Sequence, residues 1–293
     1  MEVLGREIPE ALTELHDAIV ELRPDATIRF TKSLADEAPV KAFHTYDGSG
    51  NSEIRFAEGW DDRDLAHELL HVMLYRRGFP QAASINGLGD YALTGRTLSC
   101  CVSHASLTDE VPELGGVAEF WPPNPTHPAG DETPLEISLV NAWRIAEFGD
   151  EPDADAATQA LAVRLRTEME RCRAPGATRW RRSMVELLQY LDGLEQRTPD
   201  AFGPLKSVTV TLVVTEPQLT RPADRMVELV PLGGESIGFV HKQDGGLFHY
   251  RFAAPGRKRV EIAELQAELR KSKTEPFLDA YWVPYTVDLR VKK

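Results

Sequence analysis

The strongest pattern in the chain is an almost unbroken apolar run between Leu65 and Tyr75. A run of this length with almost no polar face is typical of a buried helix. Asp61 precedes it as a helix-capping residue, and Gly78 follows it as a residue suited to a left-handed helix end. The pattern therefore predicts a central buried helix over about 62–77.

Other segments with apolar residues at helical spacing predict further helices in the first two-thirds of the chain. These predicted helices cover the first 25 or so residues, about 97–107, Thr133 to Gly149, about 154–173, and a stretch that follows Thr178. Short extended segments predict strands over 27–30, 40–46 and 53–56. A Gly-rich turn separates the last two of these strands and predicts a hairpin.

The pattern changes after Pro199, where β-branched residues become common. Here the sequence predicts one helix near 261–272 and strands over 207–214, 237–241, 247–252 and 281–291. We therefore predict an α+β fold with two domains. The first is a mainly helical domain with a small sheet over residues 1–200, and its helical part spans about 131–198. The second is a smaller α+β domain over residues 201–293.

Composition narrows the class of protein. Of the 293 residues, 42% are hydrophobic and 27% are charged, as in a folded globular chain. The net charge of −13 argues against nucleic-acid binding, which depends on clustered Lys and Arg. The sequence has no membrane-spanning apolar run and no secretion signal, so we expect a cytoplasmic protein without a membrane partner. Three cysteines offer no disulfide framework and fit a reducing compartment.

The chemistry of the predicted central helix lies in His67-Glu68-Leu69-Leu70-His71, an H-E-x-x-H motif. Two histidines four residues apart on a helix point the same way and can share one metal ion. Neutral imidazole is a good ligand for zinc, which lowers the pKa of a bound water molecule to roughly 7. Glu68 lies about 100° around the helix from His67, close enough to take a proton from that water.

These three side chains are the polar groups in the middle of an otherwise apolar helix. Burying two imidazoles and a carboxylate without partners costs several kcal/mol, so other groups must satisfy them. A metal ion does this most simply. The alternative is a cluster of hydrogen-bonded polar side chains in the core of a protein that binds no metal.

The motif, its buried helix and the strand predicted just upstream resemble the zincin metallopeptidases. The resemblance covers about residues 40–110, and it implies a zinc-dependent peptidase with a peptide or protein substrate. It also implies that Ser52 to Ala57 form the edge strand along which an extended substrate lies. The metzincin continuation is missing, because Leu74 and Arg77 stand where that group places Gly and a third His.

A catalytic zinc site needs a third protein ligand and one open position. We take His104 as the first candidate, because it lies on the next predicted helix, at the margin of its apolar stripe. Zincins with the third ligand on a following helix often use Glu there. The alternatives therefore remain Glu110, Glu113, Glu119 and Asp90.

Three other features have simpler interpretations. Cys100 and Cys101 lack a C-x-x-C partner pair, so we interpret them as small buried side chains rather than metal thiolates. The basic run from Arg179 to Arg182 is interpreted as a solvated helix start. A donor for the oxyanion that forms during hydrolysis is left open among the following residues: His44, Tyr91 and His127.

The leading hypothesis is a zinc peptidase in which His67, His71 and His104 hold Zn²⁺ and Glu68 is the general base. The alternative is a catalytically inactive zinc- or peptide-binding module that acts in regulation or as a scaffold. In either case the C-terminal domain is a candidate site for a protein partner.

Overall fold

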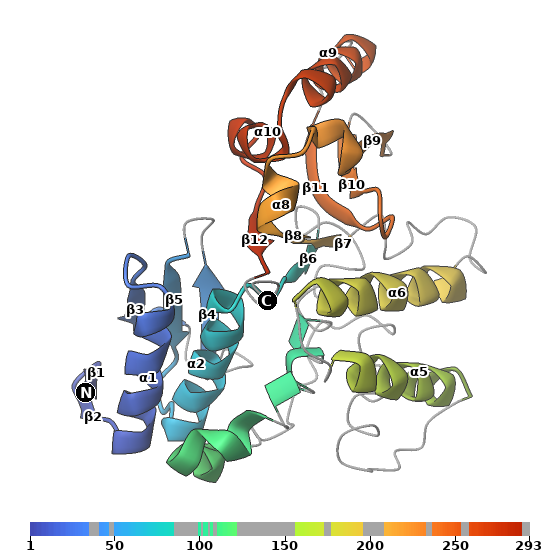
Figure 1. Cartoon of the computed structure of the whole chain (residues 1–293). Coiled ribbons are helices and arrows are strands. Elements are labelled where there is room, and N and C mark those ends of the chain that lie inside the picture. The colour runs from blue at the N-terminus through green and yellow to red at the C-terminus, as the bar shows by residue number, and fades with distance from the viewer. Residues whose placement is uncertain are drawn as a thin grey trace.

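The computed structural model confirms a mixed α+β fold with small sheets (Figure 1). Its described residues are 1–34, 41–46, 50–84, 99–100, 102–104, 106–107, 110–121, 156–172, 177–195, 208–232, 236–252 and 258–288. No helix among these residues combines the length and the apolar character needed to cross a bilayer.

The chain begins with a small hairpin, β1 (Glu2–Val3) and β2 (Arg6–Glu7), before helix α1 (Glu10–Leu22). The helix predicted for the first 25 residues is therefore confirmed only from residue 10 onward. Pro9 occupies its N-cap position, where a missing backbone N–H costs nothing. Leu12, Leu15 and Ile19 of α1 are buried in the core, whereas Ala18 is exposed and Leu22 is 41% exposed.

A three-stranded sheet follows, made of β3 (Ile28–Thr31), β4 (Ala42–Tyr46) and β5 (Ser52–Phe56). The order in space is β3-β5-β4, with β5 parallel to β3 and antiparallel to β4. The predicted β4–β5 hairpin is confirmed. Strand β5 lies in the centre of the sheet, and β4 is an edge strand within the described part of the chain.

Helix α2 (Asp62–Arg76) is the predicted central helix. The Asp61 carboxylate accepts hydrogen bonds from the backbone at the helix start, and Gly78 adopts a left-handed φ of 88° just after its end. The Arg76 guanidinium is buried and donates to the carbonyls of Ile19 and Ala26. Arg76 thus joins the end of α2 to the end of α1.

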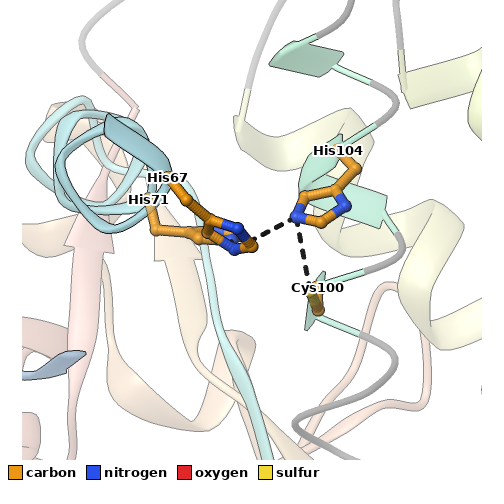
Figure 2. A group of neighbouring side chains, drawn as sticks. All are labelled: His67, His71, Cys100 and His104. Carbon is orange, nitrogen blue, oxygen red and sulfur yellow. Dashed lines mark hydrogen bonds between the residues drawn. The ribbon is translucent and has the colours of Figure 1, made fainter. Parts of the chain in front are cut away.

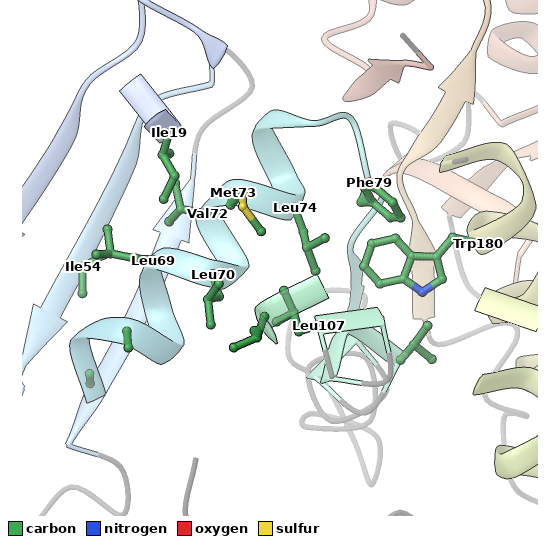
Figure 3. Close-up of a cluster of buried hydrophobic side chains, with 14 of the residues drawn as sticks. Ile19, Ile54, Leu69, Leu70, Val72, Met73, Leu74, Phe79, Leu107 and Trp180 are labelled. Carbon is green, nitrogen blue, oxygen red and sulfur yellow. The ribbon is translucent and has the colours of Figure 1, made fainter. Parts of the chain in front are cut away.

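Helix α2 buries both of its apolar faces, as Figure 3 shows. Leu69 and Val72 point toward α1 and the sheet, whereas Leu74 points toward Leu107 on the opposite side. Fully burying one such side chain contributes about 1.5–3 kcal/mol. The same hydrophobic cluster extends to Phe79, which packs edge-on against Trp180 of the next helical pair.

That helical pair consists of α5 (Ala156–Cys172) and α6 (Ala177–Glu195), both of which the sequence predicts. The interpretation of Arg179 to Arg182 as a solvated helix start is wrong for two of its residues. Trp180 and Arg181 are each 1% exposed, because that side of α6 packs against the core. The helix predicted from Thr133 to Gly149 lies outside the described residues.

The strand predicted over 207–214 is two strands, β7 (Val208–Val210) and β8 (Leu212–Val214), in two different sheets. Strand β7 pairs with β6 (Ala82–Ser84), and β8 pairs with β12 (Tyr285–Val287). The break falls at Thr211, whose backbone N–H donates to the carbonyl of Gln81. The domain boundary near residue 200 lies outside the described residues and stays a prediction.

A second hydrophobic cluster begins at Leu212 and fills the C-terminal region. Its main sheet is an antiparallel meander of β9 (Val227–Pro231), β10 (Ser236–His241) and β11 (Leu247–Phe252). The helices α9 (Lys258–Lys271) and α10 (Thr274–Ala280) pack on it (Figure 1). The predicted strand 281–291 starts later than expected, at Tyr285, because Trp282 adopts a left-handed φ of 56° before β12, and residues 289–291 lie outside the described part of the chain. Two short helices, α8 (Glu216–Leu219) and η2 (Ala223–Arg225), precede the meander.

Candidate metal centre

Helix α2 presents the two motif histidines side by side. The Nε2 atoms of His67 and His71 lie 2.8 Å apart, as expected for residues one helical turn apart. The His71 ring is buried, whereas His67 is half-buried at the rim of the cluster. The pair therefore reaches solvent on the side of His67.

His104 approaches this pair from a second helical segment, which comprises the described residues between 99 and 107. Its Nε2 lies 3.3 Å from Nε2 of His67, and its side chain is 2% exposed (Figure 2). Val102 and Leu107 are buried on the same segment and pack into the first hydrophobic cluster. This packing brings His104 opposite the motif helix.

Cys100 is the residue of the cluster that the sequence analysis missed. Its Sγ lies 3.4 Å from Nε2 of His104, and Figure 2 shows it on the same segment below the His104 ring. The signal was present in the sequence, because Cys100 and His104 repeat the four-residue spacing of His67 and His71. The ligand atoms of all four side chains lie within 4.8 Å of one another.

The four donor atoms lie close enough together for their side chains to share a metal ion. A tetrahedral zinc ion, with bonds of about 2.0–2.1 Å to nitrogen and 2.3 Å to sulfur, separates two nitrogens by about 3.3 Å and a nitrogen from a sulfur by about 3.6 Å. The observed separations of 3.3 Å between His67 and His104, and of 3.4 Å between Cys100 and His104, lie close to these values, whereas the 2.8 Å between His67 and His71 is shorter. Imidazole and thiolate are also ligands that zinc prefers.

The alternative third ligands do not join this cluster. Glu110 forms an ion pair with Arg77 near the end of α2. Glu113 and Glu119 are exposed on η1 (Val111–Phe120). Asp90 lies outside the described residues. Among the described candidates, His104 is therefore the one that the fold brings to the motif histidines.

Glu68 lies beside the cluster and does not belong to it. Its side chain is buried, and its Oε2 lies 2.6 Å from Nδ1 of His44 on β4. The His44 ring in turn stacks on His71, with 5.3 Å between the ring centroids. Glu68 is therefore a buried carboxylate paired with His44, and the His44 ring connects it to the cluster residue His71.

Two aromatic residues form walls of the site. The Trp121 ring meets His104 edge-on at 5.3 Å and His67 at 6.4 Å, which limits the rotation of both imidazoles. Tyr46 stacks against His44 on β4, and burial raises the pKa of its phenol, with the nearby Tyr75 adding to the effect. Tyr46 is therefore a neutral phenol at physiological pH.

Two sequence predictions about the substrate path change here. Strand β5 cannot be the edge strand predicted over Ser52 to Ala57, because β3 and β4 occupy its two sides. Of the three candidates for an oxyanion donor, His44 forms a hydrogen bond with Glu68. The other two, Tyr91 and His127, lie outside the described residues.

Comparisons with protein-family models, with curated proteins and with solved structures find no match to this chain.

Proposed function

We propose that the chain is a zinc-dependent peptidase of the zincin type, in which His67, His71 and His104 bind the metal ion. Two imidazoles from α2 and one from the second helical segment support this proposal. When bound, zinc supplies a Lewis acid that polarises a peptide carbonyl and makes water more acidic. The half-buried side of His67 gives the reacting groups access from solvent.

Glu68 carries the proton transfers in this proposal. Its carboxylate takes a proton from the attacking water and passes it to the nitrogen of the leaving amine. The hydrogen bond with His44 holds the carboxylate in one orientation beside the cluster. This position of Glu68 is the observation that carries the proposal, because a purely structural metal site has no need of a base.

Strand β4 is the substrate edge that the fold offers. It pairs with β5 on one side, and the described residues contain no strand on its other side. An extended peptide can pair with such an edge through its backbone. Because His44 lies in the middle of β4, a peptide bound there passes close to Glu68.

A second candidate function rests on Cys100. Structural zinc sites use four protein ligands, whereas catalytic sites use three and leave one position open. The described cluster offers four donors, and the fourth is a thiol. This observation favours a metal-stabilised binding module without turnover, with the C-terminal region as a candidate site for a protein partner.

Replacement of Glu68 separates the two functions. We expect the zinc-loaded protein to cleave a mixed library of fluorogenic peptides, and Glu68→Gln to reduce cleavage by 10²- to 10⁴-fold with one zinc ion still bound. The matched control is Glu119→Gln, which makes the same chemical change at an exposed position and should leave cleavage unchanged.

Two results count against the peptidase. Full activity of Glu68→Gln on a cleaved peptide overturns the role of Glu68. A zinc-loaded protein that cleaves no peptide in the library, while zinc raises its melting temperature, supports the binding module instead.

A further inference from the structure

We propose that the Cys100 thiolate is a displaceable fourth ligand, which closes the metal site at rest and restrains hydrolysis until it leaves. The restraint of hydrolysis rests on the proposed peptidase function. Ligation by Cys100 rests on the geometry of the cluster alone.

The geometry places Cys100 in the ligand sphere. Its Sγ is 3.4 Å from Nε2 of His104, close to the separation of about 3.6 Å that a shared tetrahedral ion requires. The ligand atoms of His67 and His71 complete a group in which no two atoms are more than 4.8 Å apart. A metal ion held by the three imidazoles would therefore lie within reach of the Cys100 sulfur.

Ligation by four side chains conflicts with the chemistry assigned to Glu68. A four-coordinate zinc ion with three imidazoles and a thiolate has no position for water or for a peptide carbonyl. The site thus contains both a proposed base, Glu68, and a proposed fourth ligand, Cys100. The two roles are compatible if one of the four ligands leaves the metal ion during the reaction.

Cys100 is the ligand best placed to leave. The rings of His71 and His104 are buried and packed, His71 against His44 and His104 against Trp121. Cys100 is half-buried, and its side chain is short compared with the imidazoles. Its thiolate can therefore turn toward solvent with little change in the surrounding core.

The spectrum of the cobalt-substituted protein tests ligation without reference to activity. A thiolate bound to Co²⁺ gives a strong charge-transfer band in the near ultraviolet, which nitrogen and oxygen ligands do not give. We expect this band in the wild-type protein and its loss in Cys100→Ala, with one Co²⁺ still bound. Zinc should also slow alkylation of Cys100 by iodoacetamide at least tenfold, as followed by peptide mass spectrometry.

The matched control is Ser106→Ala, which removes one heavy atom from a small buried side chain of the same segment. The hydroxyl of Ser106 makes no hydrogen bond with the described residues, so the variant should keep the fold and the cobalt band. If Cys100→Ala fails to bind Co²⁺, Cys100→Ser provides a second variant that keeps the shape of the side chain.

Activity then tests the restraint. Zinc-loaded Cys100→Ala should cleave fluorogenic peptides several times faster than the wild-type protein, while Ser106→Ala should match the wild type. A wild-type spectrum without the charge-transfer band overturns the inference even if peptides are cleaved. A band with no cleavage by either protein confirms ligation and overturns the restraint together with the peptidase proposal. Equal cleavage by both proteins overturns the restraint alone.

Discussion

The Nδ1 atom of His44 lies 2.6 Å from Oε2 of Glu68, and this contact joins the middle of β4 to the central helix. It ties the strand that offers a free edge to the carboxylate proposed as the base. Because His44 also stacks on His71, one side chain contacts both the base and a metal ligand. The geometry points to His44 as a positioning residue that aligns Glu68 with a peptide on β4.

Replacing His44 by Phe should keep the ring stacking and remove the hydrogen bond to Glu68. Loss of a polar partner behind a catalytic group commonly costs 10- to 100-fold in activity. We expect kcat for peptide cleavage to fall by this factor, with KM within threefold of the wild-type value and one zinc ion bound. Steady-state kinetics and metal analysis provide the measurement.

The control for this variant is His16→Phe, which makes the same change on α1, where His16 contacts Asp17 and Phe30. It should leave kcat unchanged. A rise in KM with constant kcat in His44→Phe, or loss of the zinc ion, would contradict the positioning role.

Removing His104 should weaken zinc binding, because the imidazole lies in the cluster. Ligand binding stabilises a protein by RT ln(1 + [L]/Kd), about 2.7 kcal/mol at a free zinc concentration of 100 Kd. We expect His104→Ala to lose most of this gain at the same zinc concentration, as measured by thermal unfolding with and without zinc. The exposed Glu113→Ala should keep the gain in full. A loss with Glu113→Ala and none with His104→Ala would assign the third ligand to the glutamate.

The central helix could be predicted because its signals are local. Asp61, Gly78 and the apolar run between them act within a few residues of one another, and the structure places the helix ends where these residues predict them. The pairing of His67 and His71 is equally local, since one turn of helix sets it.

The place of Cys100 depends on contacts between segments that lie far apart in the sequence. Spacing alone showed that Cys100 and His104 share one helix face. It did not show that this face meets α2, because that depends on how Val102 and Leu107 pack into the core. Without a C-x-x-C pair, the sequence favoured a small buried side chain over a metal thiolate, and the structure places Cys100 beside the three histidines.

The order of the strands in the β3-β5-β4 sheet could likewise not be predicted from the local pattern of apolar and polar residues. Ser52 to Phe56 alternates as any strand with one buried face does, with Ile54 and Phe56 buried and Glu53 and Arg55 less buried between them. The edge position was implied only by the resemblance to the zincins. Its parallel pairing with β3 requires the chain to pass through β4 first. Only the tertiary arrangement reveals that β5 is central and that β3 and β4 are the edge strands among the described residues.

The buried guanidinium of Arg181 links α6 to the C-terminal meander. It donates to the carbonyls of Val210 and Gly246 and pairs with the carboxylate of Asp244 at 3.4 Å. Burial lowers the pKa of Arg181 to about 10, against the effect of Asp244, so the side chain stays charged at neutral pH. Burial raises the pKa of Asp244, but the His241 hydrogen bond and the Arg181 charge outweigh it and keep the pKa low.

Arg181→Met should therefore destabilise the protein by about 3–5 kcal/mol, because it leaves the Asp244 carboxylate without its cation. Urea unfolding at pH 7 measures the difference in free energy of unfolding. The control is Arg179→Met, which changes an exposed arginine two residues away and should cost less than about 0.5 kcal/mol. Equal effects of the two variants would show that the buried pair contributes nothing specific.

His249 on β11 should make the C-terminal region sensitive to acid. Burial, with a further contribution from the nearby charge of Arg251, lowers the pKa of its imidazole to about 4, and the ring packs edge-on against Phe239. The folded state therefore keeps His249 neutral at pH values where the unfolded chain, with a pKa near 6.5, already takes up a proton. The free energy of unfolding should fall as the pH drops from 6.5 to 4, by up to about 3 kcal/mol.

His249→Gln replaces the titrating imidazole by a neutral side chain of similar size. The free energy of unfolding of this variant should therefore change less between pH 6.5 and 4 than that of the wild-type protein. Urea unfolding at pH 7 and at pH 4.5 measures the slope for both proteins. The metal-free protein in chelator is used, because protonation of the zinc ligands would otherwise add its own loss of stability. Identical slopes for the two proteins would contradict the burial of a neutral His249, whereas a flatter slope for His249→Gln assigns the acid sensitivity to this side chain.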